Sequence, residues 1–88
     1  MSDLEYDILD ELYFVQSFHE LNEKLQWEDY ALRDTLRNLL DKGWIRCYAS
    51  PKEEIPDNEL DFEIQYRNYY YIASKDGLLA HNSTDHHE

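Results

Sequence analysis

The sequence contains little cysteine, glycine, proline or positive charge. Cys47 is the one cysteine, which excludes an intramolecular disulfide framework. Only two glycines and two prolines accompany a hydrophobic fraction of 42%, so the chain is not of the low-complexity or disordered kind. Its longest apolar run, residues 69–73, is too short to cross a bilayer. A length of 88 residues predicts one small domain.

Signals for export and for catalysis are also missing. Residues 1–10 are acidic, whereas the start of a secretory signal is basic, so we expect a cytoplasmic protein. Glycine-rich phosphate loops, nucleophile elbows and paired metal-ligand motifs do not occur, and we expect no enzymatic activity, catalytic residue, cofactor or metal site. Cys47 is interpreted as a small core residue. His19 and Glu23 have a spacing that can hold a metal, but no second ligand pair accompanies them.

The charge balance is strongly negative. Twenty acidic residues stand against eight basic ones, and the formal net charge is −12. Such a charge repels the phosphate backbone and removes the electrostatic term that supplies most non-specific affinity for nucleic acids. The distribution is uneven, because residues 24–52 sum to +2 whereas the rest of the chain sums to −14. A nucleic-acid contact, if the chain makes one, is therefore expected in this middle segment.

Helical periodicity dominates the first half of the chain. Residues 3–15 place their apolar side chains on one face and predict a first amphipathic helix. Ser17 and Glu20 have the spacing of a capping box, which predicts the start of a second helix. A third helix over residues 28–42 buries a stripe of leucines and ends at Gly43, a residue that readily adopts the left-handed conformation.

The second half of the chain alternates between apolar and polar residues. Residues 45–49 and 62–72 predict two or three antiparallel strands. The register of the second run directs Ile64 and Ile72 inward, and therefore directs Tyr69 and Tyr71 outward. Residues 50–61 are polar, contain both prolines and predict a loop.

The end of the chain predicts one more short element. Ser74 is placed to cap a short last helix that extends to His81. Residues 82–88 predict a frayed tail, in which the Asp-His-His-Glu ending is either solvated or an adventitious metal binder. The domain is therefore assigned to residues 1–81.

The leucine ladder carries a resemblance to a known superfamily. Its members follow the pattern L-x3-L-x6-L-x3-L-x2-L-x3-G-W-I and are Leu21, Leu25, Leu32, Leu36, Leu39, Gly43, Trp44 and Ile45. This pattern resembles the helix-turn-helix core of bacterial winged-helix regulators. The resemblance covers residues 3–79 and implies an α+β winged-helix fold. That fold is a three-helix bundle with a helix-turn-helix, followed by an antiparallel β-hairpin wing and a short C-terminal helix.

The resemblance also implies a way of binding DNA. In such proteins the helix after the turn enters the major groove, and the wing contacts the minor groove or the backbone. Residues 28–42 would then be the recognition helix of a transcriptional regulator. Arginine and asparagine suit the edges of guanine and adenine. The candidate nucleic-acid contacts are Tyr30, Arg33, Asp34, Arg37, Asn38, Lys42, Arg46 and Lys52.

Charge argues against that role. Lys52 is followed by six acidic residues between positions 53 and 63, in the segment where the wing would approach phosphates. On the helix, Asp29 and Asp41 lie four residues from Arg33 and Arg37, respectively, and predict local ion pairs that compete with a phosphate. We therefore place protein contact or dimerisation ahead of DNA binding.

The protein-contact hypothesis relies on aromatic side chains, which are enriched at interfaces. Trp44, Tyr48, Tyr69 and Tyr71 are the interface candidates. The expected function is a non-catalytic regulatory or adaptor module whose partner is another protein or a second copy of the chain, with no membrane and no small-molecule substrate implied. A DNA-binding regulator is the alternative, and an acidic surface that imitates DNA is a third hypothesis.

Overall fold

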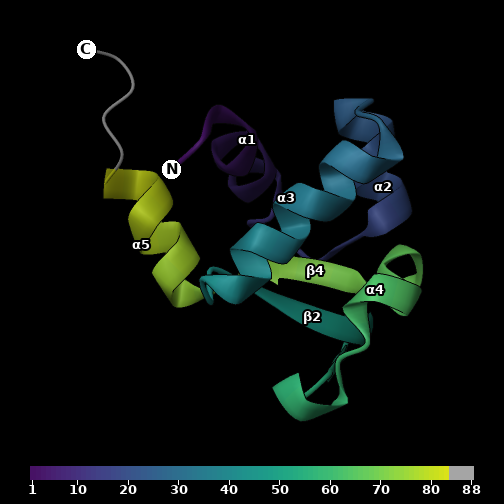
Figure 1. Ribbon diagram of the computed structural model, residues 1–88. Helices are drawn as coiled ribbons and strands as arrows, with labels where there is room; N and C mark the ends of the chain where they lie inside the picture. Colours follow the sequence, from purple (N-terminus) through teal and green to yellow (C-terminus); the bar gives the residue numbers. More distant parts are fainter. Residues whose placement is uncertain (84–88) are drawn as a thin grey trace.

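The computed structural model describes residues 1–83 and has the predicted α+β class. Within these residues, five α-helices accompany a four-stranded antiparallel sheet (Figure 1). The helices are α1 (Asp3–Glu11), α2 (Phe18–Leu25), α3 (Asp29–Asp41), α4 (Phe62–Gln65) and α5 (Lys75–Ser83). The strands are β1 (Gln16–Ser17), β2 (Ile45–Ser50), β3 (Glu53–Glu54) and β4 (Tyr70–Ala73). Figure 1 shows α1, α2 and α3 grouped above β2 and β4, with α5 at the side.

Local hydrogen bonds set the starts of the first two helices. The predicted capping box of α2 is confirmed, because Ser17 Oγ accepts from Glu20 N at 3.0 Å and Glu20 Oε1 accepts from Ser17 N at 2.8 Å. The same arrangement at Ser2 and Glu5 begins α1. The helix α1 ends at Glu11, four residues earlier than predicted. The chain must turn there, because the next residues form β1 and pair with β4.

The core lies between the three N-terminal helices and the sheet. The leucine stripe of α3 is fully buried against α1 and β2, as predicted. Gln26 ends α2 in the left-handed conformation with φ of 56°, and Glu28 precedes α3. Gly43 lies in the turn between α3 and β2 and has a φ of 74°. A glycine is required there because a residue with a side chain is strained in this left-handed conformation. The amide of Trp44 then donates to Leu39 O at 2.9 Å, which directs the chain into β2.

The sheet has the strand order β1-β4-β2-β3. The central pair joins β2 to β4 from Ile45 opposite Ala73 to Tyr48 opposite Tyr70. The short β1 covers the outer edge of β4, and β3 covers only the far end of β2. Within residues 1–83, the first residues of β2, Ile45 and Arg46, therefore have no strand on the edge opposite β4.

Ser74 joins the sheet to α5. Its hydroxyl donates to Gly43 O at 2.7 Å and accepts from Gly77 N at 3.1 Å, which confirms the predicted cap. Gly77 packs directly on the backbone, since an added Cβ would lie 2.0 Å from Trp44 O. The helix extends to Ser83 and therefore includes the first two residues of the predicted tail. The other residues of that tail, 84–88, lie outside the described residues.

The prediction of a strand over residues 62–72 is wrong in its first half. Residues 62–65 form α4 and residues 66–68 a 3-10 turn, so only Tyr70–Ala73 are a strand. The four-residue spacing of Phe62 and Tyr66 brings their rings within 5.6 Å on one side of a helical turn. Ile64, predicted to face inward, is 72% exposed. Alternation over so few residues does not distinguish a helical turn from a strand.

The predicted loop over residues 50–61 has some structure of its own. It contains β3 and a 3-10 turn at Asp57–Glu59. Helix α4 and the turn after it then bring the chain back toward α3.

In the described part of the chain, no helix is both long enough and apolar enough to span a membrane.

Candidate interaction surface

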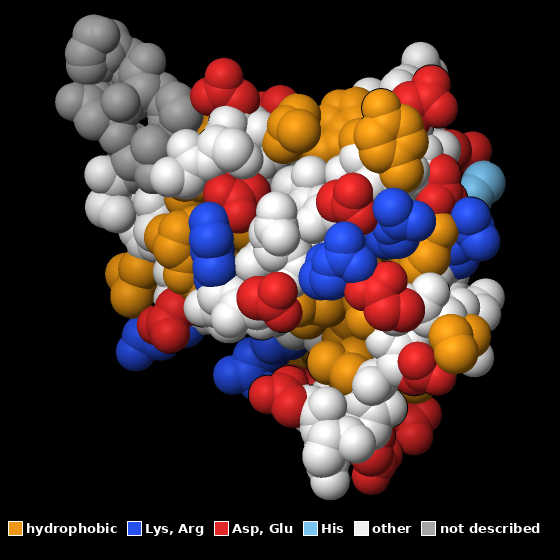
Figure 2. Space-filling view, viewed as in Figure 1, with side chains coloured by type: hydrophobic (Ala, Val, Ile, Leu, Met, Phe, Trp, Pro, Cys, Tyr) orange, Lys and Arg blue, Asp and Glu red, His pale blue; other side chains and the backbone are white. Residues whose placement is uncertain are grey.

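The exposed face of α3 is a mixture of acidic and basic side chains that bind one another. Arg33 Nε and Arg37 Nη2 both donate to Asp34 Oδ1, each at 2.9 Å. Arg37 also forms an ion pair with Glu63 of α4. The hydrogen bond from Arg33 holds the pKa of Asp34 below its ordinary value. Figure 2 shows the Lys and Arg side chains of this face interspersed with Asp and Glu.

The first turn of α3 is bound to the segment that follows α4. Tyr66 Oη donates to Asp29 Oδ1 at 2.6 Å, and Arg67 Nε donates to Asp29 Oδ2 at 2.8 Å. The Arg67 guanidinium also lies 4.9 Å from the centre of the Tyr66 ring. The bonds from Arg67 and Tyr66 lower the pKa of Asp29. This contact fastens the long β2–β4 connection to α3.

The prediction that Asp29 pairs with Arg33 and Asp41 with Arg37 is wrong. Arg33 and Arg37 bind Asp34 and Glu63, whereas Asp29 binds Arg67. Asp41, the predicted partner of Arg37, has no cationic side chain within 4.0 Å among residues 1–83. The return of the chain through α4 supplies competing partners, which spacing along the helix cannot reveal.

Two other basic candidates are also bound to carboxylates. Lys42 Nζ donates to both oxygens of Glu5, at 2.7 Å and 2.9 Å, and lies 4.7 Å from the centre of the Trp44 ring. Arg46 Nη1 lies 3.2 Å from both carboxylate oxygens of Glu54. Hydrogen bonds to Lys42 and Ser2 lower the pKa of Glu5, although burial, the largest single influence, acts in the opposite direction.

The remaining nucleic-acid candidates are accessible. Tyr30 is 60% exposed on the first turn of α3, and Asn38 is exposed farther along the same helix. Lys52 is exposed in the turn between β2 and β3, and no carboxylate lies within 4.0 Å of it among the described residues. The accessible candidates are therefore Lys52, which is a cation without a carboxylate partner among the described residues, and the uncharged Asn38 and Tyr30.

The aromatic interface candidates fall into two groups. Trp44 and Tyr48 are half-buried, so part of each ring is available for contact. Tyr69 and Tyr71 are buried, which corrects their predicted outward direction. Tyr71 Oη donates to Tyr66 O at 2.8 Å. The register of β4 is opposite to the predicted one, and Ile64, from which that register was taken, lies in α4 and not in the strand.

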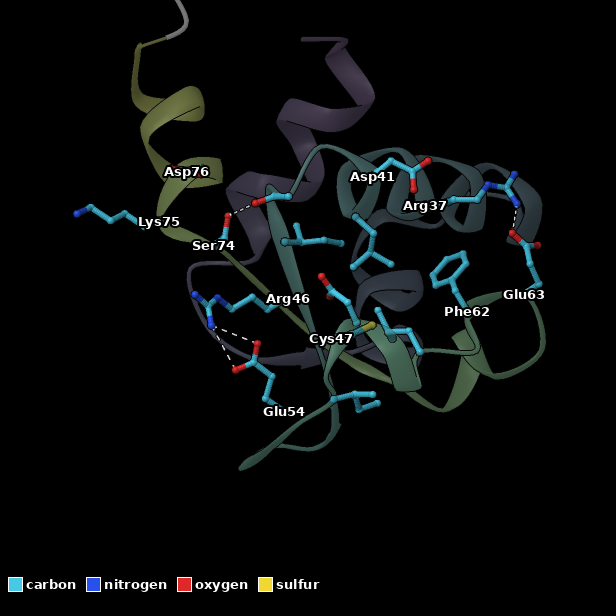
Figure 3. A pocket seen from close by; sticks show the side chains of 16 residues that line it. Arg37, Asp41, Arg46, Cys47, Glu54, Phe62, Glu63, Ser74, Lys75 and Asp76 are labelled. Atoms are coloured by element: carbon cyan, nitrogen blue, oxygen red, sulfur yellow. Dashed lines mark hydrogen bonds and ion pairs between the residues drawn. The ribbon is translucent and has the colours of Figure 1, made fainter.

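A groove lies beside this face, between α3, β2, the segment 54–63 and the start of α5 (Figure 3). Its volume is about 910 Å³. The hydrophobic residues that line it include Leu40, Ile55, Leu60 and Phe62, all half-buried. Charged residues of α3, α4, β2 and α5 form its rim, including the Arg37–Glu63 and Arg46–Glu54 pairs.

Cys47 lines the groove but has no nucleophilic character there. The residue is 2% exposed. Burial raises the pKa of its thiol to about 12, so the reactive thiolate is scarce at neutral pH. The thiol is therefore a packing group in the wall of the groove.

Most of the groove was not visible in the sequence. Leu40 follows Leu36 by four residues and so borders the leucine stripe, whereas Ile55 and Leu60 stand in a segment interpreted as a polar loop. The one available signal was the presence of these two isolated apolar residues between the acids of residues 53–61. Their meeting with Leu40 depends on the return of the chain toward α3.

Comparisons with other proteins give no relative for this arrangement. Protein-family models, curated proteins and solved structures were each searched, and none matches the chain. Within residues 1–83, no cluster of three or more His, Cys, Asp or Glu side chains is placed to hold a metal ion.

Proposed function

We propose that this chain is a winged-helix module of regulatory or adaptor type that acts through protein contacts and has no catalytic activity. The order of elements supports the winged-helix assignment. Three helices come first, α2 and α3 are joined by a short turn, and the antiparallel strands β2 and β4 follow. Residues 51–69 take the place of a simple wing, and the second part of this segment, at Glu63, Tyr66 and Arg67, binds α3.

The pairing of the basic side chains is the observation that carries the protein-contact proposal. Arg33, Arg37, Lys42 and Arg46 were the cations expected to meet phosphates, and each is bound to a carboxylate. A phosphate would have to displace these partners and approach the carboxylates that remain beside them. Affinity for DNA comes largely from cations that release counterions from the backbone, and this surface has few to offer.

Exposed apolar side chains supply material for a protein contact. Phe14 is 78% exposed in the turn after α1, and Tyr30 and Ile64 are also largely exposed. Aromatic residues are among those that most often dominate the binding energy of an interface. Figure 2 shows hydrophobic side chains gathered over the upper part of the α-helical layer, near α1 and the start of α3.

DNA binding is the second candidate, and one observation favours it. Tyr30 and Asn38 are accessible on α3, the helix that would enter the major groove. Asparagine can read adenine through paired hydrogen bonds. This candidate requires the chain to bind a duplex with the side of α3 that holds Asp34 and Asp41.

Fluorescence anisotropy with a labelled random duplex of about 30 base pairs, at about 50 mM salt, tests the choice. We expect no saturable binding by the parent chain. The variant Asp34→Asn with Glu63→Gln releases Arg33 and Arg37, and we expect it to gain weak, salt-sensitive binding. Tight binding by the parent that is lost in Arg33→Ala with Arg37→Ala would instead establish the DNA-binding function.

Sedimentation velocity tests the protein side of the proposal. If the partner is a second copy, the sedimentation coefficient of the parent rises with concentration, and the rise is smaller for Phe14→Ser or Tyr30→Ser. A parent that stays monomeric directs the search to a different protein. In that case the same two variants, compared with an Asp7→Asn control on α1, should retain less of the partner.

A further inference from the structure

The groove between α3 and β2 combines an apolar wall with an acidic rim. Leu40, Ile55, Leu60 and Phe62 are half of the hydrophobic residues that pack around the core while staying partly exposed. They come from α3, the β2–β4 connection and α4, so their meeting is a product of the fold. Apolar surface of this kind remains in contact with water unless a partner covers it.

The rim has more negative than positive charge left unpaired. Arg37 and Arg46 are held by Glu63 and Glu54, and Figure 3 shows both pairs at opposite sides of the groove. Lys75 is the one rim cation without a carboxylate partner among residues 1–83. Against it stand three rim carboxylates without a cationic partner in the same part of the chain, which are Asp41, Asp57 and Asp76.

Asp41 is costly for the stability of the helix that carries it. It is the last residue of α3, and the cation that follows it at the C-cap, Lys42, is bound to Glu5. The carbonyl end of a helix has a partial negative charge, so a carboxylate there is repelled. Asp41 has no intramolecular cation to offset this repulsion among the described residues. A positively charged group brought by a partner would offset it.

We propose that this groove binds an extended segment of a partner protein in which Lys or Arg residues flank an aliphatic or aromatic residue. The apolar side chain contacts Leu40, Leu60 and Phe62, and the flanking cations lie near Asp41 and Asp57. The inference rests on the proposed function and names the chemistry of the partner. Charge selects this occupant, because a second copy of the chain brings a formal charge of −12 and a nucleic acid brings phosphates.

A pair of labelled peptides tests the groove directly. The probe is a fluorescein-labelled peptide of about nine residues with the central sequence Lys-Leu-Lys-Phe-Lys between Gly-Ser ends, and its control has Ser in place of Leu and Phe. At about 150 mM salt we expect the parent chain to bind the probe and to bind the control peptide about tenfold more weakly. Equal binding of the two peptides would overturn the proposal, because the apolar wall would then have no role.

Charge-matched variants separate the groove from the general acidity of the chain. Asp41→Asn with Asp57→Asn should weaken probe binding about tenfold. Asp7→Asn with Glu23→Gln makes the same change in net charge on the exposed surfaces of α1 and α2 and should change it less than about twofold. Equal losses in the two double variants would refute the site.

A third variant reports on the apolar wall. Leu60→Ser should weaken the probe about fivefold and leave the control peptide unchanged. Its thermal unfolding, followed by circular dichroism, identifies any loss of fold. Amide shifts in nuclear magnetic resonance spectra should move at Leu40, Ile55 and Phe62 on addition of the probe to the parent, and shifts confined to other surfaces would refute the groove.

The outcome for the groove is separable from the outcome for the proposed function. Failure of the probe to bind, with the duplex also unbound, rejects the groove and leaves a protein-contact module with another surface. Tight duplex binding by the parent rejects the proposed function whatever the peptide does.

Discussion

The ion pair between Glu5 and Lys42 joins α1 to the end of α3, and Lys42→Met removes it while retaining the length of the side chain. Glu5 is 4% exposed and receives the ammonium on both carboxylate oxygens. A methionine can still pack on the Trp44 ring. The substitution therefore leaves a buried carboxylate without its cation and changes little else.

The expected cost can be worked from the surroundings of the pair. Removing one partner of a fully buried ion pair costs about 3–5 kcal/mol. Two features reduce that figure here, because Ser2 N still donates to Glu5 Oε1 at 3.0 Å and the Lys42 side chain is 42% exposed to water. We expect a loss of about 2 kcal/mol in the free energy of unfolding, which lowers the Tm of a chain this size by about 10 °C.

The pH dependence of this loss has a definite sign. In the parent, the pKa of Glu5 is lowered by folding, so its contribution to stability is present above the unfolded pKa and is lost as the pH falls through the folded one. In Lys42→Met the lowering of the pKa by Lys42 is lost, so the folded pKa of Glu5 is higher than it is in the parent. The deficit of the variant is therefore greatest near neutral pH and shrinks on acidification.

A double-mutant cycle followed by urea unfolding checks the reasoning. Glu5→Gln keeps an acceptor for Ser2 N and removes the charge. Because the buried charge is then absent, adding Lys42→Met should cost much less than it does in the parent, with an interaction energy of about 1.5 kcal/mol. Additive losses, or a loss in Lys42→Met that is equal at pH 7 and pH 4, would show that the buried charge is not the cause.

Three further predictions follow from single contacts. Gly77→Ala should lower the free energy of unfolding by about 3 kcal/mol in chemical denaturation, because its Cβ collides with backbone, whereas Gly43→Ala, which meets only left-handed strain, should lower it by about 1 kcal/mol. Cys47, with a thiol pKa of about 12, should react with a thiol reagent at neutral pH only after urea unfolds the chain, and rapid labelling of the native chain would contradict its burial. Folding lowers the pKa of Asp29, so the contribution of Asp29 to stability is present at neutral pH and is lost as the pH falls through the folded pKa. Arg67→Ala should weaken this loss of stability in acid, measured by urea unfolding at several pH values. Identical pH profiles for the parent and the variant would refute the role of the Asp29–Arg67 pair.

Local patterns in the sequence determined much of the helical part of the fold. Ser17 and Glu20 satisfy backbone groups within three residues of themselves, and Gly43 adopts its own left-handed conformation, so neither feature depends on distant chain. The leucine stripe of α3 is buried as its spacing predicts, because a helix with one apolar face packs that face against the core. The Ser2–Glu5 box had the same signature and was equally readable.

Tertiary structure alone decided the conformation of residues 62–68, the inward direction of Tyr69 and Tyr71, and the partners of the basic side chains. Lys42 finds Glu5 thirty-seven positions away, and Arg37 finds Glu63 twenty-six positions away. The groove has the same origin, because Leu40 and Leu60 meet only after the β2–β4 connection returns to α3. Hydrogen bonds within one turn can be read from residue spacing, whereas pairs and grooves formed across the chain depend on which elements the packing of the core brings together.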